Sequence, residues 1–331
     1  MPWKVLITRK IPDAGLEVLR KNNLQIEILE PGKDNKDIIL QSKIGEADAL
    51  LCLLTDTITS DLVGRAQRLK IIANYAVGYN NIDVPACSRM GIAVTNTPGV
   101  LTEATADMAM TLMLSAAKRI VEADAFTRKG LFIGWEPMLL LGADLSGKTL
   151  GIVGAGRIGR AVAKRAAGFD MQILYTDRDR VEQIESDFGA QAVDLETLLR
   201  QSDFVSLHVP LDDTTHHMIN AERLSLMKPG AYLINTARGP VIDESALYHA
   251  LKNNALAGAG LDVYENEPKI TPGLTDLPNV VLLPHIASAT VETRNKMARI
   301  AAENIVAMYD NQRPPNLINP ESLEKGKHVA T

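Results

Sequence analysis

The segment from Leu150 to Arg160, LGIVGAGRIGR, constrains the fold of this chain more than any other. It opens with a short apolar run, passes through glycines spaced as G-x-G-x-x-G, and continues into residues that favour a helix. A second apolar run covers 172–176 and ends beside Asp177. We therefore predict a strand, a tight turn, a helix and a second strand, the arrangement that binds a dinucleotide.

Each glycine of this motif has a physical role in holding a dinucleotide. Gly154 permits the sharp turn out of the strand, Gly156 lets the backbone approach the pyrophosphate, and Gly159 keeps the helix close to the sheet. The phosphates would lie at the helix amino terminus, where unpaired N–H groups favour an anion. Asp177 would accept hydrogen bonds from the ribose and repel a phosphate, which favours NAD over NADP, although Arg178 weakens that preference. A glycine-rich turn in an ordinary α/β protein is the alternative.

The composition is that of a globular chain long enough for two domains. Of its 331 residues, 46% are hydrophobic and 23% are charged, with a net charge of −5, so we expect neither nucleic acid nor a membrane as a partner. The two cysteines, Cys52 and Cys87, follow no disulfide or metal-ligand spacing, and the histidines form no metal-ligand group, so we predict reduced thiols and no metal. Without a signal peptide or a membrane-spanning run, the sequence predicts a cytoplasmic protein.

Strand and helix signals alternate along most of the chain, which predicts parallel sheets covered by helices on both faces. Before residue 99 we expect strands at 5–8, 25–29, 49–53, 71–73 and 93–95. After it we expect strands at 149–153, 172–176, 204–207, 231–234, 256–261 and 280–283, which complete one doubly wound sheet. The predicted fold class is α/β with two doubly wound parallel-sheet domains, one a Rossmann dinucleotide-binding domain and the other flavodoxin-like.

The last amphipathic helix, from residue 291 to about 309, has no strand after it, so we expect it to return to the first domain. The predicted domains are then 1–98 with 289–331, which binds the substrate, and 99–288, which binds NAD. A long helix is predicted from about 101 to 129, apolar over much of its circumference. Core packing and a subunit interface both explain that helix.

Polar residues follow three predicted strands at the edge where an α/β sheet binds its ligand. Arg238 could bind a carboxylate and polarise a carbonyl group, and His285 could give or take a proton near neutral pH. Glu267, if paired with His285, would favour the imidazolium form. Taken singly, these residues could equally be a surface ion pair, a core histidine and a solvated loop charge. Together with a nicotinamide, they indicate hydride transfer to a keto acid.

The loop Asn74–Asp83 also follows a predicted strand, and the glycine within it, Gly78, could turn successive N–H groups toward a carboxylate. A plain turn fits the same residues. Leu53 and Trp135 are candidates to line a pocket for a small substrate, and each fits a core role equally well. His208 ends a predicted strand, where cofactor contact and a purely structural role are both open.

At these residues the chain resembles the D-isomer-specific 2-hydroxyacid dehydrogenase family over nearly its whole length. The matching segments are 75–83, 154–159 with Asp177, 207–210, 235–239, 262–268 and 284–288. Within the family the chain is similar to glyoxylate and hydroxypyruvate reductases through Gly134-Trp135-Glu136-Pro137 and Pro314-Pro315-Asn316-Leu317. The resemblance implies an oxidoreductase that forms a homodimer through its nucleotide-binding domains.

The same resemblance implies a set of site residues. Arg238, Glu267 and His285 would be the catalytic residues, with His285 the proton donor in reduction, and the Val77 and Gly78 N–H groups would hold the substrate carboxylate. Besides the three glycines and Asp177, the implied cofactor contacts are Thr105, Ala155, Arg157, Ile158, Arg178, Asp179, His208, Pro210, Thr215, Thr236, Ala237, Arg238, Asp262, His285, Ile286 and Ala287.

We therefore expect NADH-dependent reduction of a small 2-keto acid, glyoxylate or hydroxypyruvate, to the 2-hydroxy acid. NADP remains an alternative cofactor, because glyoxylate reductases of this type often lack an acid at the position of Asp177. One alternative function is a dehydrogenase of the same fold acting on D-lactate, phosphoglycerate or phosphite. A non-enzymatic NAD-binding scaffold, as in transcriptional corepressors of this fold, is the other.

Overall fold

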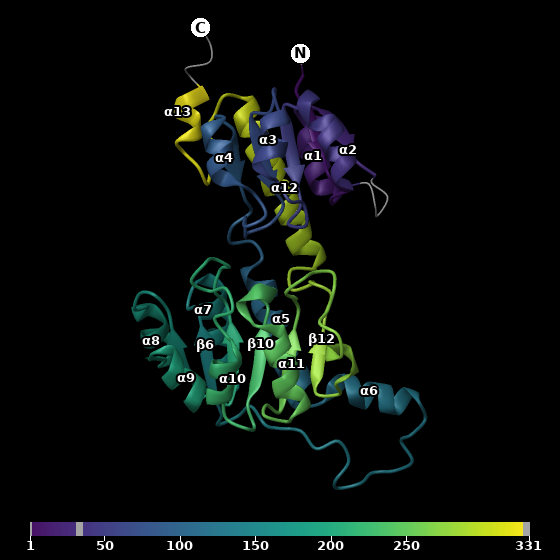
Figure 1. The fold of residues 1–331 in the computed structure, drawn as a ribbon, viewed down its shortest axis with the longest axis vertical. Helices are drawn as coiled ribbons and strands as arrows, with labels where there is room; N and C mark the ends of the chain where they lie inside the picture. The colour runs from purple at the N-terminus through teal and green to yellow at the C-terminus, as the bar shows by residue number, and fades with distance from the viewer. Residues whose placement is uncertain (1, 31–35, 327–331) are drawn as a thin grey trace. The chain divides into compact units, whose positions relative to one another are not determined.

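The computed structural model describes residues 2–30 and 36–326, which form two compact units (Figure 1). Unit 1 comprises Met1–Leu101 and Ala289–Thr331, and unit 2 comprises Thr102–Ser288. Each unit contains one sheet, and every strand pair within both sheets is parallel. The predicted α/β class with two parallel sheets is confirmed.

The sheet of unit 1 has five strands in the order β2-β1-β3-β4-β5. This is the flavodoxin-like order. Its strands are β1 (Lys4–Ile7), β2 (Gln25–Ile28), β3 (Ala49–Cys52), β4 (Ile71–Asn74) and β5 (Ala93–Thr95). Its helices are α1 (Asp13–Lys21), α2 (Lys36–Lys43), α3 (Ser60–Arg65), α4 (Val84–Arg89), α12 (Val291–Tyr309) and α13 (Ser322–Gly326), with a 3-10 turn η1 at Ile44–Glu46.

Alternate residues of these strands enter two separate cores, one on each face of the sheet. Leu51 and Ala73 pack with α1 and α12, whereas their neighbours Leu50 and Ile72 pack under α2, α3 and α4. Because both faces are covered, the strands read as continuous apolar runs in the sequence.

The C-terminal part of the chain belongs to unit 1. Helix α12 packs along α1, and the segment after it pairs with the edge strand β5. There Leu317 pairs with Thr95 in antiparallel fashion, and the Ile318 N–H donates to the Val94 carbonyl at 2.8 Å. This segment covers the edge of the sheet.

The sheet of unit 2 has seven strands in the order β12-β11-β10-β9-β6-β7-β8. They are β6 (Thr149–Val153), β7 (Gln172–Thr176), β8 (Gln191–Ala192), β9 (Phe204–Leu207), β10 (Tyr232–Asn235), β11 (Gly258–Leu261) and β12 (Val280–Leu282). The helices are α5 (Thr102–Ala117), α6 (Ile120–Arg128), α7 (Arg157–Ala167), α8 (Glu182–Phe188), α9 (Leu195–Gln201), α10 (Ala221–Leu226) and α11 (Glu244–Lys252), with 3-10 turns η2 (Gly239–Val241) and η3 (Leu274–Asp276). Our prediction of six strands missed β8, which is only two residues long and exposed.

The helix predicted from 101 to 129 is two helices, so that prediction is wrong in its length. Arg119 adopts a left-handed conformation, with φ at 53°, and ends the continuous helix between α5 and α6. Helix α5 is largely buried in the core of unit 2, against α7, β10 and β11. Helix α6 buries no residue.

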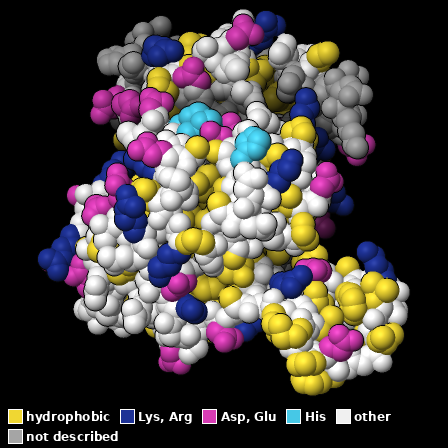
Figure 2. Space-filling view, turned by 60° about the horizontal axis from the view of Figure 1, so that its bottom comes forward, with side chains coloured by type: hydrophobic (Ala, Val, Ile, Leu, Met, Phe, Trp, Pro, Cys, Tyr) yellow, Lys and Arg dark blue, Asp and Glu magenta, His cyan; other side chains and the backbone are white. Residues whose placement is uncertain are grey.

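The segment 120–141, which we call the arm, extends from the rest of unit 2 (Figure 1). Its large apolar side chains are exposed, with Ile133 at 91% and Trp135 at 83%. Hydrophobic side chains accordingly cover much of the lobe at the lower right of Figure 2. The exposed apolar residues of the arm are Ile120, Val121, Leu131, Phe132, Ile133, Trp135, Met138 and Leu141.

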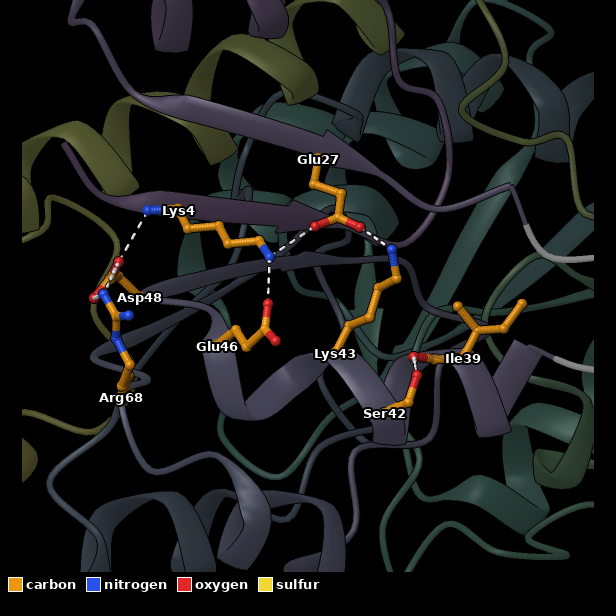
Figure 3. Close-up of polar contacts among 8 residues, drawn as sticks. All are labelled: Lys4, Glu27, Ile39, Ser42, Lys43, Glu46, Asp48 and Arg68. Atoms are coloured by element: carbon orange, nitrogen blue, oxygen red, sulfur yellow. Dashed lines mark hydrogen bonds and ion pairs between the residues drawn. The ribbon is translucent and has the colours of Figure 1, made fainter.

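Charged side chains form ion pairs and hydrogen bonds around the amino-terminal edge of the sheet in unit 1 (Figure 3). The Asp48 carboxylate accepts the Lys4 N–H at 2.9 Å and pairs with the Arg68 guanidinium at 3.1 Å. The Lys4 ammonium pairs with Glu27 at 2.9 Å and with Glu46 at 2.8 Å. Lys43 forms a further ion pair with Glu27.

Candidate active site

The predicted glycine turn joins β6 to α7. Gly154 has φ at 94°, and a Cβ there would lie 2.8 Å from the backbone of His208. A Cβ on Gly159 would lie 2.1 Å from the Gly154 carbonyl oxygen, so the helix can approach the turn only at a glycine. The N-cap residue of α7 is Gly156, which has no side chain to cap the helix, and among the described residues the space beside it is open. These features fit a pyrophosphate bound by backbone N–H groups.

Asp177 follows β7 and is exposed beside the glycine turn. One carboxylate oxygen accepts the Ala155 N–H at 2.7 Å, and the other accepts the Arg178 N–H at 2.7 Å. The carboxylate therefore links the end of β7 to the turn. Each carboxylate oxygen retains capacity for a further hydrogen bond, as contact with a ribose requires.

Two buried polar atoms at neighbouring strand ends have no hydrogen-bond partner in the described part of the chain. They are Nδ1 of His208, after β9, and Oγ1 of Thr236, after β10. The other ring nitrogen of His208 lies 2.8 Å from Ser206 Oγ, and burial lowers the pKa of His208 to about 3, so the ring is neutral. Unpaired buried polar atoms are costly, and a bound dinucleotide at this edge would supply partners.

The structure brings His285 and Glu267 together. Nδ1 of His285 lies 2.9 Å from a Glu267 carboxylate oxygen, and their side chains are 24% and 29% exposed. The second Glu267 oxygen accepts the Tyr264 N–H at 3.0 Å, which fixes the carboxylate. Burial acts to raise the pKa of Glu267, but the contact with His285 and the charge of Arg238 outweigh it, so the pKa of this carboxyl is lowered. Glu267 is thus ionised at neutral pH.

Arg238 lies in the same region of unit 2, after β10, which neighbours β11 in the sheet. Its guanidinium donates to the Ala237 carbonyl at 2.7 Å, and burial lowers its pKa while the charge of Glu267 opposes that effect. The buried Asn235 holds the loop, because its amide donates to the Arg238 carbonyl at 2.9 Å and its oxygen accepts the Ala237 N–H. A Cβ on Gly239 would lie 1.9 Å from the Tyr264 backbone, so the two loops pack closely.

Asp262, predicted as a cofactor contact, has both carboxylate oxygens bound to backbone. They accept the Ile286 and Ala287 N–H groups, each at 2.7 Å, and the residue is fully buried. Burial raises the pKa of this carboxyl, although the two N–H groups oppose the rise. His285, the residue before these N–H groups, has φ at 55°. Asp262 therefore fixes the strained loop that carries the histidine to the end of β11.

The predicted carboxylate-binding loop lies in unit 1, between β4 and α4. Its carbonyls are held from within the unit: Thr97 N–H donates to Ala76 at 2.9 Å, and the Asn96 side chain donates to Val77 at 2.7 Å. The Asn74 side chain donates to the Gly78 carbonyl at 2.9 Å. Among the described residues, neither the Val77 nor the Gly78 N–H has a hydrogen-bond acceptor.

The other predicted site residues differ in burial and lie in both units. Leu53 packs partly buried beside a core of unit 1, whereas Trp135 stands exposed on the arm. Thr105 is buried on α5, and Thr215 is buried with its hydroxyl on the Pro210 carbonyl at 2.7 Å. Six further predicted cofactor contacts are exposed or half-exposed: Arg157, Ile158, Arg178, Asp179, Pro210 and Ile286.

Sequence reasoning gave no role to Asn235 or Asn96, the asparagines that support these loops. Asn235 ends β10 and Asn96 directly follows β5, so each stands at the carboxyl-terminal edge of a sheet. Their position at the end of a strand is the sequence signal that could have identified them, since polar residues at this edge support ligand-binding loops. Among residues 2–30 and 36–326, no group of three or more His, Cys, Asp or Glu could hold a metal ion. No described helix is long and apolar enough to cross a membrane.

Comparison with known proteins gives a consistent result. Residues 110–287 match the family model described as D-isomer specific 2-hydroxyacid dehydrogenase, NAD binding domain. The chain is 53% identical to a glyoxylate reductase of Thermococcus litoralis over 98% of each chain, and 50% identical to one of Korarchaeum cryptofilum, also over 98% of each.

Solved structures agree with these sequence relationships. A glyoxylate reductase from Paecilomyes thermophila superimposes with a TM-score of 0.85 at 35% identity, covering 97% of this chain and 99% of that one. An NADPH-dependent glyoxylate/hydroxypyruvate reductase from Sinorhizobium meliloti, in complex with NADP and malonate, gives 0.87 at 33% identity, covering 97% and 98%. The chain belongs to the D-isomer specific 2-hydroxyacid dehydrogenase family and is an oxidoreductase.

Proposed function

We propose that this protein reduces glyoxylate, or another 2-keto acid nearly as small, to the 2-hydroxy acid with NADH. The observation that carries the proposal is the 2.9 Å contact between His285 and the ionised Glu267, beside Arg238 at adjacent strand ends. When bound, NADH supplies the hydride that reduces the carbonyl carbon. The names of the curated relatives support glyoxylate as the substrate.

His285 donates the proton that completes the reduction. Its Nδ1 faces Glu267, so Nε2 is the atom that gives its proton to the oxygen of the former carbonyl. Glu267 remains ionised and stabilises the protonated ring, as a carboxylate does for other catalytic histidines. The pair therefore supplies an acid whose charge balances the negative oxygen that develops during hydride transfer.

Arg238 and the loop at Gly78 hold the substrate. The Arg238 guanidinium binds an oxygen of the keto acid and polarises the carbonyl, because it keeps its charge despite burial. The Val77 and Gly78 N–H groups bind the carboxylate, and the absence of other acceptors for them among the described residues supports this role. In this scheme residues 1–98 with 289–331 form the substrate-binding domain and 99–288 form the NAD-binding domain.

We assign NADH as the preferred cofactor. Asp177 places a negative charge beside the glycine turn, where it accepts ribose hydroxyls and repels the additional phosphate of NADPH. The glycine turn, the start of α7, His208 and Thr236 would contact the remainder of the dinucleotide. Cys52 and Cys87 are both buried and form no disulfide among the described residues, which supports a reducing, cytoplasmic location.

We also propose a homodimer formed through unit 2, with the arm as the surface covered by a second copy. The arm exposes more large apolar side chains than the rest of unit 2, and such a patch on a globular domain marks an interface. Trp135, the candidate to line a substrate pocket, is exposed on this arm. It can line a pocket only where the second copy covers the arm. Light scattering of the wild type and of Ile133→Asp tests this, because a dimer that persists in the variant at micromolar concentration would contradict the interface.

A steady-state comparison tests the enzymatic proposal. Values of kcat/KM are measured for glyoxylate, hydroxypyruvate, pyruvate, 3-phosphohydroxypyruvate and, in the oxidative direction, phosphite, each with NADH and NADPH or their oxidised forms. We expect glyoxylate or hydroxypyruvate with NADH to give the highest value. Tight NADH binding without turnover of any substrate would support the scaffold alternative and reject the enzyme.

A further inference from the structure

The loop 76–78 is held through its carbonyl groups at three consecutive positions. Ala76 accepts from the Thr97 N–H at 2.9 Å, Val77 accepts from the Asn96 side chain at 2.7 Å, and Gly78 accepts from the Asn74 side chain at 2.9 Å. Three consecutive carbonyls with donors outside regular secondary structure leave this loop little freedom to rotate its peptide planes.

The planarity of the peptide bond converts this arrangement into control of the N–H groups. In a trans peptide the C=O of one residue and the N–H of the next lie in one plane and point in opposite directions. The bond to the Ala76 carbonyl therefore directs the Val77 N–H away from Thr97. In the same way, the bond from Asn96 to the Val77 carbonyl directs the Gly78 N–H away from Asn96.

Asn96 is itself fixed by the C-terminal part of the chain. The buried Asn304 on α12 donates to the Asn96 carbonyl at 3.3 Å and accepts the Asn316 N–H at 3.1 Å. The Asn96 N–H in turn donates to the Asn316 carbonyl at 3.4 Å. The returning helix and the segment after it thus determine where the Asn96 amide lies.

Asn74 is fixed on the other side of the loop. Its amide also contacts Asn81 at 3.2 Å, and the Asn81 amide donates to the Leu53 and Asp56 carbonyls at 3.2 and 3.1 Å. Both asparagines that hold the loop are therefore members of larger hydrogen-bond networks.

We propose that Asn96 is a positioning residue that orients the Gly78 N–H toward the substrate carboxylate by holding the Val77 carbonyl. This inference rests on the proposed function, in which the Val77 and Gly78 N–H groups bind that carboxylate. Asn96 does not touch the substrate and takes no part in proton or hydride transfer. Its removal weakens binding of a carboxylate and leaves the cofactor and the proton donor unaffected.

The test compares Asn96→Ala and Asn96→Leu with the wild type. Leucine has the same branching and number of side-chain heavy atoms as asparagine and lacks the donor, so it separates loss of the hydrogen bond from an unfilled cavity. Asn22→Ala is the matched control, because Asn22 is another half-buried asparagine of unit 1 whose amide donates to a carbonyl, that of Val18 at 2.9 Å. The measurements are kcat and KM for glyoxylate, the Kd of oxalate for the NADH complex, the Kd of NADH and the melting temperature.

For both Asn96 variants we expect the KM of glyoxylate and the Kd of oxalate to rise about tenfold, since the charge-assisted hydrogen bond from the Gly78 N–H is lost. The kcat should change less, and the Kd of NADH should stay unchanged. Asn22→Ala should show wild-type values for all ligand constants. A general loss of folding would lower the melting temperature without selecting the carboxylate ligands.

The outcomes separate this inference from the proposed function. If the wild type reduces glyoxylate and both Asn96 variants keep its KM and the Kd of oxalate, the positioning role is wrong and the enzyme assignment stands. If either variant fails to fold, the other decides, and failure of both shows that Asn96 is needed for folding and overturns the specific role. If the wild type neither reduces a 2-keto acid nor binds oxalate, the proposed function and this inference both fail.

Discussion

The two sheets are built alike at their amino-terminal edges. In unit 1, Asp48 lies just before β3 and accepts the Lys4 N–H at the start of β1 at 2.9 Å. In unit 2, Asp203 lies just before β9 and accepts the Thr149 N–H at the start of β6, also at 2.9 Å. Each carboxylate also pairs with a cation, Arg68 in one unit and Lys228 in the other.

The carboxyl-terminal edges of the same sheets differ in chemistry. Unit 1 presents backbone N–H groups in a loop held by neutral asparagines. Unit 2 presents an uncapped helix amino terminus, an arginine, and a histidine paired with a glutamate. The two parallel sheets thus share a stabilising carboxylate at one edge and present different sets of candidate ligand-binding groups at the other edge, where α/β folds place their sites.

Replacing His285 gives the largest expected change if unit 2 supplies the acid. His285→Ala should lower kcat by about 10² to 10⁴ and leave the Kd of NADH unchanged, because general acid catalysis contributes about that factor. His285→Asn is a second variant, since asparagine tolerates the positive φ of this position. His217→Ala is the control, as His217 pairs with Glu265 at the same 2.9 Å. Equal losses of kcat in His285→Ala and His217→Ala would contradict the role of His285 as the proton donor.

Glu267→Gln should reduce turnover less and move its pH dependence. The lowered pKa of Glu267 means that the carboxylate is charged throughout the neutral range and favours the protonated ring of His285. With glutamine, the loss of glyoxylate reduction at high pH should begin at a lower pH. The matched variant Glu265→Gln, which removes the negative charge facing His217, should keep the wild-type profile of kcat/KM against pH. An unchanged profile in Glu267→Gln would contradict the pairing as a source of acid catalysis.

The cofactor preference should respond to the charge of Asp177. Asp177→Asn keeps an acceptor for the Ala155 N–H and removes the charge, so the ratio of kcat/KM for NADPH over NADH should rise about tenfold. Asp187→Asn makes the same change of charge on the exposed face of α8 and should leave this ratio unaltered. A ratio that does not move in Asp177→Asn would show that other residues select the cofactor.

The smallest effects are expected at the amino-terminal edges, where the two units should behave alike. Asp48→Ala and Asp203→Ala should each lower the free energy of unfolding by about 1–3 kcal/mol, because a strand N–H loses its acceptor. NADH binding and KM for glyoxylate should change little. Urea denaturation measures the first effect, and a selective loss of activity in either variant would show that the amino-terminal edges are not separate from function.

The contribution of Asp203 should also depend on pH. Burial acts to raise its pKa, but the Thr149 N–H and Lys228 lower it below its ordinary value of 3.8. A carboxyl whose pKa is lowered on folding stabilises the protein above its unfolded value, and that stabilisation is lost as the pH falls through the folded value. The difference in stability between the wild type and Asp203→Asn should therefore be full at pH 7, begin to shrink near pH 3.8, and disappear only as the pH falls through the lowered pKa of the folded protein.

The order of elements followed directly from the sequence. Continuous apolar runs such as 149–153 and 204–207 predicted strands that are buried on both faces, and the glycine spacing identified the turn after β6. These signals are local, because strand, turn and helix preferences depend on neighbouring residues. The short β8 and the break at Arg119 lacked such signals and were missed.

The partners of the candidate site could be predicted only in part. A strand end marks His285 as a candidate, but its contact with Glu267 joins residues 18 positions apart through the packing of two loops. The strand end before Asn96 could mark it as a candidate, but it could not show its hydrogen bonds to Val77, Asn304 and Asn316, which are distant in the chain.

By itself the sequence determined the parallel α/β architecture, the glycine turn and the family, since each depends on residue types at fixed local spacing. Only the tertiary structure decided which carboxylate faces His285, that Asp262 holds a backbone loop, and which asparagines hold the loop at Gly78. The reason is physical: hydrogen-bond geometry acts over about 3 Å, and only the folded chain brings distant residues within that range.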